Sequence, residues 1–352
     1  MSGPSFSRRH GLRLAAAAGI AASASSGRPA AALPSAAAST SSEARPPQRI
    51  MMILFRGETE VEEGFRAYLD EQDFAVDLIV RNVDRKREAI ADFIDEAREL
   101  RPDLVYTWGT SVTLGVVGPY DAVDPARHLT DIPVVFTMVS TPVESKVVRS
   151  LASSDRNVTG VSHTVPLETQ IRAMRAYRPV RRLATIYNAD EENSVVNVRQ
   201  LQALSLAMDF ELLAKPVPPG PDGQPDPASL PGLIEDLAAR EPQFLYIGPD
   251  TFIGVYRDVI TQGAIRHFVP AFTGTELEIR HSFAMVGLVS RYVNVGRFTA
   301  YKAAQVFQAG AAPSSIPVET LKRFGYLVRM PVARQLALYP PVGLLSYAEL
   351  VE

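Results

Sequence analysis

Side chains that could do chemistry are present in this sequence, but not at the spacings that enzymes use. The four histidines beyond the N-terminal segment stand far apart, at positions 128, 163, 267 and 281. Adjacent carboxylates such as Glu191 and Glu192 would point in different directions on a helix, so adjacency alone does not make them an acid/base pair. The sequence contains no nucleophile elbow, glycine-rich nucleotide loop or H-E-x-x-H metal motif. We therefore expect a protein that is not an enzyme and that uses neither a metal nor a cofactor.

A different pattern does recur, because polar side chains follow the apolar segments that we predict to be strands. In the first half of the chain these residues are Arg56, Trp108, Thr110, Ser111, Ser140 and Thr141. In the second half they are Glu191, Asn193, Ser194 and Asp250. Since the carboxyl ends of parallel strands meet at one edge of a sheet, these groups predict a binding site for a small ligand. Free N–H groups at the start of each following helix suit a ligand carboxylate. For Ser140, Asn193 and Ser194, simple helix capping is the competing interpretation.

The elements that must position these side chains are strands that alternate with helices. Short apolar segments predict buried strands at 50–55, 75–80, 104–108, 133–137, 183–188, 211–217, 244–247 and 269–273. Amphipathic patterns predict helices at 60–69, 85–101, 167–177, 194–208, 229–240 and 296–309. This alternation is typical of the α/β class with parallel sheets. A glycine-containing connector at 157–162 divides the strands between two sheets of similar size.

Composition and charge exclude several classes of protein. Hydrophobic residues make up 46% and charged residues 21% of the 352 residues, which is the balance of an ordinary globular fold. With no cysteine, the chain has neither disulfides nor thiolate metal sites. The net charge is −3, and the first 47 residues hold five arginines but only one glutamate, so the rest is more acidic still. Nucleic acid is therefore not an expected partner.

The first 47 residues read as an export signal. Arg8 and Arg9 precede an apolar, alanine-rich stretch over 14–24, and small residues of the Ala-x-Ala type follow. The apolar stretch is too short to cross ~30 Å of hydrocarbon, so we expect no integral membrane anchor. The adjacent arginines predict the twin-arginine pathway and a periplasmic location. The general secretory route and a plain Ala/Ser-rich tail are the alternatives.

Three blocks carry a resemblance to a known family: IPVVFTMVSTPV at 132–143, NVTGVS at 157–162 and IYNADEENS at 186–194. In order along the chain, they resemble blocks of the ABC-transporter solute-binding proteins of the tryptophan/tyrosine-uptake type. The resemblance implies a type I periplasmic binding fold, in which two α/β lobes joined by three crossovers close on a ligand. It places the crossovers near 160–165, 284–291 and 313–320. The implied domains are a signal peptide and linker (1–47), a first lobe (48–160 plus 285–313) and a second lobe (161–284 plus 314–352).

Departures from the family pattern bear on the ligand. Positions that match the family's ligand loops are Thr110, Ser140, Glu191, Asn193, Ser194 and Asp250. Thr141 and Glu144 stand where relatives commonly have Asp and Gly, and Arg291 stands where an Asp is frequent. If Arg291 faces the cleft, it can hold a carboxylate in a bidentate way; a solvated arginine and a partner to Glu144 are the alternatives. Apolar or stacking surface would come from Phe55, Trp108 and Tyr187. An amino acid, a small peptide-like acid or an aromatic carboxylate fits this set.

The resemblance implies a function as an exported binding protein of an ABC importer. Such a protein would act as a monomer that captures a small molecule and delivers it to a permease with a cytoplasmic ATPase. The alternative is an exported module that presents its ligand to a sensor kinase or chemoreceptor. Both functions need a hinge and a docking surface, so the residues alone do not separate them.

Overall fold

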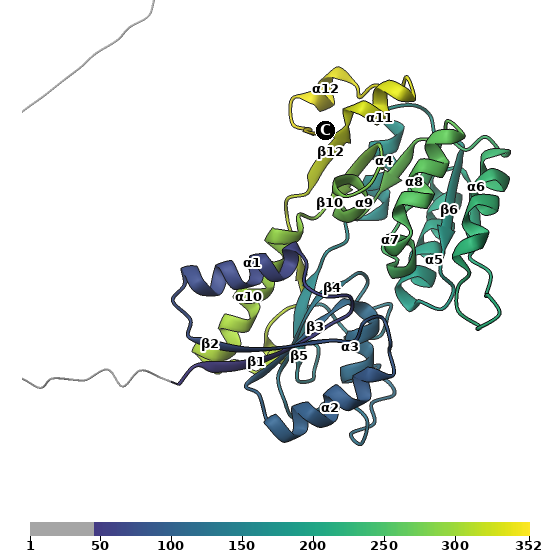
Figure 1. The fold of residues 1–352 in the computed structure, drawn as a ribbon. Coiled ribbons are helices and arrows are strands. Elements are labelled where there is room, and N and C mark those ends of the chain that lie inside the picture. Colours follow the sequence, from purple (N-terminus) through teal and green to yellow (C-terminus); the bar gives the residue numbers. More distant parts are fainter. Residues whose placement is uncertain (1–45) are drawn as a thin grey trace, which may run out of the picture. The chain divides into compact units, whose positions relative to one another are not determined.

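The computed structural model of the protein describes residues 46–352, so the predicted leader lies outside the described residues. A first sheet has six strands in the order β11-β5-β4-β3-β1-β2, and all neighbouring pairs are parallel. Figure 1 shows this sheet with helices packed around it. We call this unit the first lobe. Its strands are β1 (Gln48–Leu54), β2 (Val76–Asn82), β3 (Leu104–Trp108), β4 (Val134–Val139), β5 (Val158–Ser162) and β11 (Glu319–Thr320).

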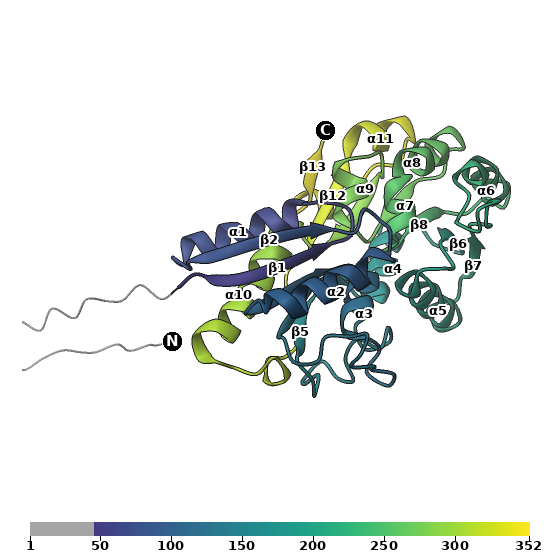
Figure 2. The ribbon, with the colours of Figure 1, turned by 60° about the horizontal axis from the view of Figure 1, so that its bottom comes forward.

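Four helices accompany the first sheet: α1 (Glu60–Glu71), α2 (Ala89–Leu100), α3 (Gly109–Val117) and α10 (Tyr292–Ala309). Although far apart in sequence, α1 and α10 lie side by side (Figures 1 and 2). Their approach is so close that a Cβ on Gly64 would stand 2.0 Å from the carbonyl oxygen of Val293. A Cβ on Gly296 would stand 1.8 Å from that of Val61. These two glycines therefore allow α10 to pack backbone to backbone against α1.

A second sheet has seven strands in the order β13-β12-β10-β9-β8-β6-β7, and only the β10–β12 pair is antiparallel. This sheet and its helices form the second lobe. Its strands are β6 (Arg182–Tyr187), β7 (Glu211–Pro216), β8 (Phe244–Ile247), β9 (Ala271–Thr273), β10 (Val286–Val289), β12 (Gly325–Arg329) and β13 (Glu349–Val351). The two sheets confirm the predicted α/β class.

Short helices predominate in the second lobe. They are α4 (Leu167–Arg175), α5 (Glu192–Ala207), α6 (Leu230–Ala238), α7 (Thr251–Val255), α8 (Arg257–Arg266), α9 (Glu276–Arg280), α11 (Met330–Gln335) and α12 (Val342–Leu345). Two 3₁₀ turns, η1 (Pro227–Ser229) and η2 (Pro313–Ser315), complete the described elements. No helix among residues 46–352 is long and apolar enough to cross a bilayer.

The central strands of each sheet are buried on both faces, which explains why they read as continuous apolar runs. In β1, residues 50–54 are all fully buried. In the second lobe, alternate residues of β8 belong to different apolar clusters, with Leu245 and Ile247 in one and Phe244 and Tyr246 in the other. The period of two expected for a strand thus divides the core of this lobe into two layers.

The chain crosses between the sheets three times, after β5, after β10 and after β11. The first crossover, at 163–166, falls close to its expected place. The expected boundaries at 285 and 313 need correction, because 286–289 pair within the second sheet and 319–320 within the first. The second and third crossovers therefore lie at 290–291 and 321–324. The sequence predicted neither β10 nor β11, and a strand of two residues such as β11 is too short to show a period.

Candidate functional site

A cavity lies between the two lobes at the carboxyl ends of their strands, and we call it the interlobe cavity. It measures about 520 Å³ including its opening to solvent. From the first lobe and the crossovers, it is lined by Phe55, Arg56, Trp108, Gly109, Thr110, Ser111, Met138, Ser140, His163 and Tyr292. From the second lobe, it is lined by Asn193, Pro249, Asp250, Thr251, Gly254, Thr275, Leu277 and Glu278.

On the first-lobe side, a cation and an aromatic ring meet at the ends of β1 and β3. The guanidinium carbon of Arg56 lies 5.0 Å from the centre of the Trp108 ring, within range of a cation–π contact. Helix α3 starts directly after Trp108, at Gly109, whose φ of +83° favours a residue without a side chain. The first three residues of α3, Gly109 to Ser111, line the cavity, and the free N–H groups of a helix start suit an anion.

Three buried polar atoms on the cavity wall have no hydrogen-bond partner within residues 46–352. They are Nε1 of Trp108, Oγ1 of Thr110 and Nδ1 of His163. Their side chains come from residues that are 7%, 4% and 3% exposed, respectively. Burial lowers the pKa of His163 to about 4, so this ring is neutral at pH 7. Unpartnered buried polar groups are costly in folded proteins, so a polar ligand that reached these three atoms would relieve that cost.

On the second-lobe side, two carboxylates join the loop after β6 to the loop after β8. Asp250 caps α7 by accepting from the N–H of Ile253 (2.9 Å), and it also accepts from the N–H of Asn188 (2.7 Å) and the hydroxyl of Ser194 (2.5 Å). Glu191 accepts from the N–H groups of Thr251 and Phe252 at 2.9 and 3.2 Å. Burial, and then the charge of nearby Glu191, raise the pKa of Asp250 to about 7.

A third carboxylate, Glu278 of α9, reaches the cavity from another part of the second lobe. Its side chain is 2% exposed, and its Oε2 accepts from the hydroxyls of Thr273 (3.1 Å) and Thr275. Burial raises the pKa of Glu278, whereas the charge of Arg56 lowers it. Among the described residues that line the cavity, Arg56 is the one arginine or lysine, and its charge acts on Glu278.

The structure brings seven of the predicted ligand-binding residues to the wall of the interlobe cavity: Arg56, Trp108, Thr110, Ser111, Ser140, Asn193 and Asp250. Glu191 and Ser194 lie behind the wall and hold Asp250 and α7 in place. Tyr187, at the end of β6, does not line the cavity. Thr141 lines a second, wider hollow beside the first crossover, of about 1450 Å³ including its opening.

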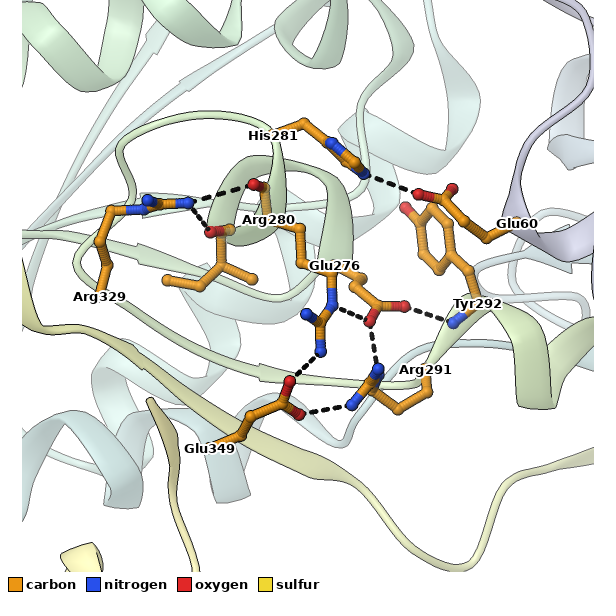
Figure 3. A network of polar contacts seen from close by, with 9 residues as sticks. Glu60, Glu276, Arg280, His281, Arg291, Tyr292, Arg329 and Glu349 are labelled. Carbon is orange, nitrogen blue, oxygen red and sulfur yellow. Dashed lines mark hydrogen bonds and ion pairs between the residues drawn. The ribbon is translucent and has the colours of Figure 1, made fainter. Parts of the chain in front are cut away.

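Arg291 also lies away from the interlobe cavity, in a network of ion pairs (Figure 3). Its Nε is 2.6 Å from Oε1 of Glu276, and its Nη1 is 2.5 Å from Oε2 of Glu349. Arg280 pairs with the same two carboxylates. Glu276 in turn accepts from the N–H of Tyr292, so the network ties the second crossover to α9. The expected role of Arg291 as a carboxylate ligand is therefore corrected, because both its carboxylate partners are supplied by the protein.

Sequence reasoning missed several residues that line the cavity, notably Met138, His163, Tyr292 and Glu278. For Glu278 a signal did exist, since the polar residues Thr273, Gly274 and Thr275 end the predicted strand at 269–273 and follow it directly. His163 lies in the first crossover and Tyr292 directly after the second, so their positions depend on how the chain passes between the lobes. Within residues 46–352, no group of three or more acidic or histidine side chains is arranged to hold a metal ion.

Comparisons with known proteins identify the fold and the family of the chain. The chain is 26% identical over 192 residues to a tyrosine-binding protein of Clostridioides difficile (strain R20291), a match that covers 54% of this chain and 53% of that protein. A conserved domain protein of Vibrio cholerae has a similar structure, with a TM-score of 0.75, 18% identity, and 87% of this chain and 99% of that chain covered.

A Streptococcus pneumoniae ABC domain in complex with L-Trp gives a TM-score of 0.73 and 19% identity, covering 86% of this chain and 100% of that chain. These likenesses establish the type I periplasmic binding fold. The model of one family, described as ABC transporter substrate binding protein, matches residues 57–351, which is most of the chain. The chain therefore belongs to the family of ABC transporter substrate-binding proteins.

Proposed function

We propose that this protein captures an aromatic amino acid or a close analogue in the interlobe cavity and delivers it to the permease of an ABC importer. The observation that carries the proposal is the cavity itself, whose walls come from both lobes. It combines the unpartnered polar atoms of Trp108, Thr110 and His163 with opposed charges on the two lobes. A neutral sugar would leave those charges unused, whereas a zwitterion matches them.

The lining also supports the aromatic part of the ligand. Phe55, Trp108, Met138 and Leu277 provide apolar surface next to the polar groups. An amino acid could therefore place its ring against this surface and its carboxylate near the start of α3. The names of two similar proteins, a tyrosine-binding protein and an ABC domain with bound L-Trp, support the same ligand class.

Capture between two lobes requires that they move. A ligand that contacts both walls stabilises the closed arrangement, and the three crossovers are the segments that can act as the hinge. Small-angle X-ray scattering should therefore show a smaller radius of gyration when a verified ligand saturates the protein. An unchanged scattering profile at saturation would contradict closure.

The family implies a site of action outside the cytoplasm, and the basic, alanine-rich segment supports export to the periplasm. We expect the mature chain to begin between residues 30 and 48, which N-terminal sequencing of the periplasmic fraction would check. Replacing Arg8 and Arg9 together by lysine should block a twin-arginine route but have little effect on general secretion. We expect a monomer that docks on its permease, and size-exclusion chromatography with light scattering would detect a stable dimer.

Titration calorimetry with the common amino acids tests the ligand class. We expect saturable binding of tyrosine or tryptophan, with weak or no binding of glycine, aspartate and simple sugars. Binding of a sugar in preference to every amino acid would overturn the proposal. Turnover of a bound amino acid into a product would show that the protein is an enzyme and would overturn it as well.

A further inference from the structure

The three carboxylates near the interlobe cavity are not equivalent, because two of them already support the loops that carry them. Asp250 accepts three hydrogen bonds, from the N–H groups of Asn188 and Ile253 and from the hydroxyl of Ser194. A carboxylate offers about four lone-pair positions, so little capacity remains. Glu191 is similarly occupied by N–H groups at the start of α7. Removing either carboxylate would loosen the fold whatever the ligand is.

Glu278 is different, because only one of its oxygens is engaged. Both threonine hydroxyls that reach this carboxylate donate to Oε2. Its Oε1 lies above Gly254, where an added Cβ would stand 3.5 Å from it. The same added Cβ would stand 3.2 Å from Nη1 of Arg56. Glu278 of the second lobe and Arg56 of the first thus face each other over the bare backbone of Gly254, inside the cavity.

From this geometry we infer that Glu278 binds the ammonium group of the ligand, while Arg56 and the start of α3 bind its carboxylate. This assignment rests on the function proposed above and specifies what the site requires of its substrate, namely both charges of a zwitterion. Without ligand, the facing charges of Arg56 and Glu278 partly compensate each other across the lobes. An amino acid enters between them and gives each a closer partner.

The arrangement discriminates against molecules that carry only one of the two charges. A deaminated acid satisfies Arg56 but leaves the buried carboxylate of Glu278 without a cation at close range. A decarboxylated amine does the reverse and separates Arg56 from its partner. Because an uncompensated charge is costly away from water, both analogues should bind more weakly than the amino acid. The unpartnered hydroxyl of Thr110 adds a donor at the carboxylate end.

Calorimetry on the full chain with two sets of probes tests the inference. One set is L-tyrosine, tyramine and 3-(4-hydroxyphenyl)propionate, and the other is L-tryptophan, tryptamine and 3-indolepropionate. The wild type should prefer the amino acid by about 10- to 100-fold over both analogues, as expected for one charged hydrogen-bonding contact. In Glu278→Gln, the amino acid should bind about 10- to 100-fold more weakly, and the acid should bind as well as before or better.

Asp250→Asn is the matched control, since it removes another buried carboxylate of the same cavity. It should weaken the amino acid and the acid by a similar factor and so preserve their ratio. Should Asp250→Asn abolish the preference while Glu278→Gln keeps it, Asp250 is the ammonium partner and the inference is wrong. Glu278→Asp retains the charge and should keep part of the preference, which separates a binding defect from misfolding. If the wild type binds neither amino acid, the proposed function fails together with the inference; an unchanged ratio in folded Glu278→Gln overturns the inference alone.

Discussion

Thr110 and Thr113 stand one turn apart on α3 and should respond to the same substitution with different changes in stability. Both side chains are buried. The Thr113 hydroxyl donates to the carbonyl of Gly109 at 2.7 Å and contacts the Thr107 hydroxyl at 2.9 Å. The Thr110 hydroxyl has no partner in the described part of the chain, and Thr110 lines the interlobe cavity. Valine keeps the shape and the branched Cβ of threonine, so each substitution removes little besides a hydroxyl.

The magnitudes follow from these contacts. Burying an unpartnered hydroxyl costs about 1–3 kcal/mol, so Thr110→Val should leave the ligand-free protein as stable as the wild type or up to ~2 kcal/mol more stable. Thr113→Val removes two hydrogen bonds worth about 0.5–1.5 kcal/mol each and should destabilise the protein by ~1–3 kcal/mol. For ligand affinity the order reverses. A hydroxyl that donates to a ligand carboxylate contributes ~1.5–3 kcal/mol, so Thr110→Val should weaken binding about 10- to 100-fold.

Denaturant unfolding without ligand and titration calorimetry with the amino acid measure the two quantities separately. Thr113→Val should change affinity by less than about threefold, because its hydroxyl contacts only the protein. A Thr110→Val protein that loses as much stability as Thr113→Val would show that the Thr110 hydroxyl already has a partner, such as an ordered water. An unchanged affinity in Thr110→Val would show that this hydroxyl does not contact the ligand.

Three further predictions concern packing, pH and the ion-pair network. Gly64→Ala and Gly296→Ala place a Cβ against backbone oxygens and should each lower the free energy of unfolding by ~2 kcal/mol or more. Gly232→Ala is the control, because nothing lies within 4 Å of its added Cβ, and it should be neutral or stabilising by ~0.5–1 kcal/mol. Denaturant unfolding curves measure all three. The pKa of His163 is about 4 in the folded protein and 6.5 in the unfolded chain, so the unfolded chain binds a proton first as pH falls. Stability on the order of 3 kcal/mol is therefore lost between about pH 6.5 and pH 4. His163→Gln should lose less stability over the same pH range. Arg291→Ala should lower stability by about 1 kcal/mol but leave ligand affinity unchanged, and a large loss of affinity would restore Arg291 as a ligand contact.

The sequence predicted those strands whose apolar run is bounded sharply by polar residues. β3 and β8 begin and end at the predicted residues, because both faces of each strand are buried. For β5, at 158–162, the sequence predicted only a glycine-containing connector. Gly160 is required there because an added Cβ would stand 2.3 Å from the carbonyl oxygen of Phe136 on the neighbouring strand. That contact between strands has no signature in the local sequence.

Helix α3 is a second element that the local sequence did not predict. Its sequence, with two glycines and several β-branched residues, has low helix propensity, and we predicted only a polar loop there. Burial against β3 and β4 overrides that propensity and turns the polar segment into a helix whose start faces the cavity. The strand-end rule located the polar loops correctly. It did not distinguish side chains that reach the cavity, such as Thr110, from those that support the wall, such as Glu191 and Ser194.

Arg291 illustrates a failure that depends on long-range pairing. Its substitution for a frequent Asp predicted a ligand contact, but its carboxylate partners are Glu276 and Glu349, which lie 15 and 58 residues away in sequence. No pattern in the sequence around Arg291 predicts that Glu276 or Glu349 pairs with it. Charge at a crossover therefore predicts a site only when the elements that pack against the crossover are known.

A crystal structure of the protein with a bound aromatic amino acid tests the central claim most directly. We expect the ligand to lie in the interlobe cavity, with its ammonium nitrogen about 3 Å from Oε1 of Glu278 and its carboxylate beside Arg56 and the start of α3. The ring should pack against Phe55 and Trp108. Electron density for the ligand in the hollow beside Thr141, or an amino group that contacts Asp250 and not Glu278, would contradict it.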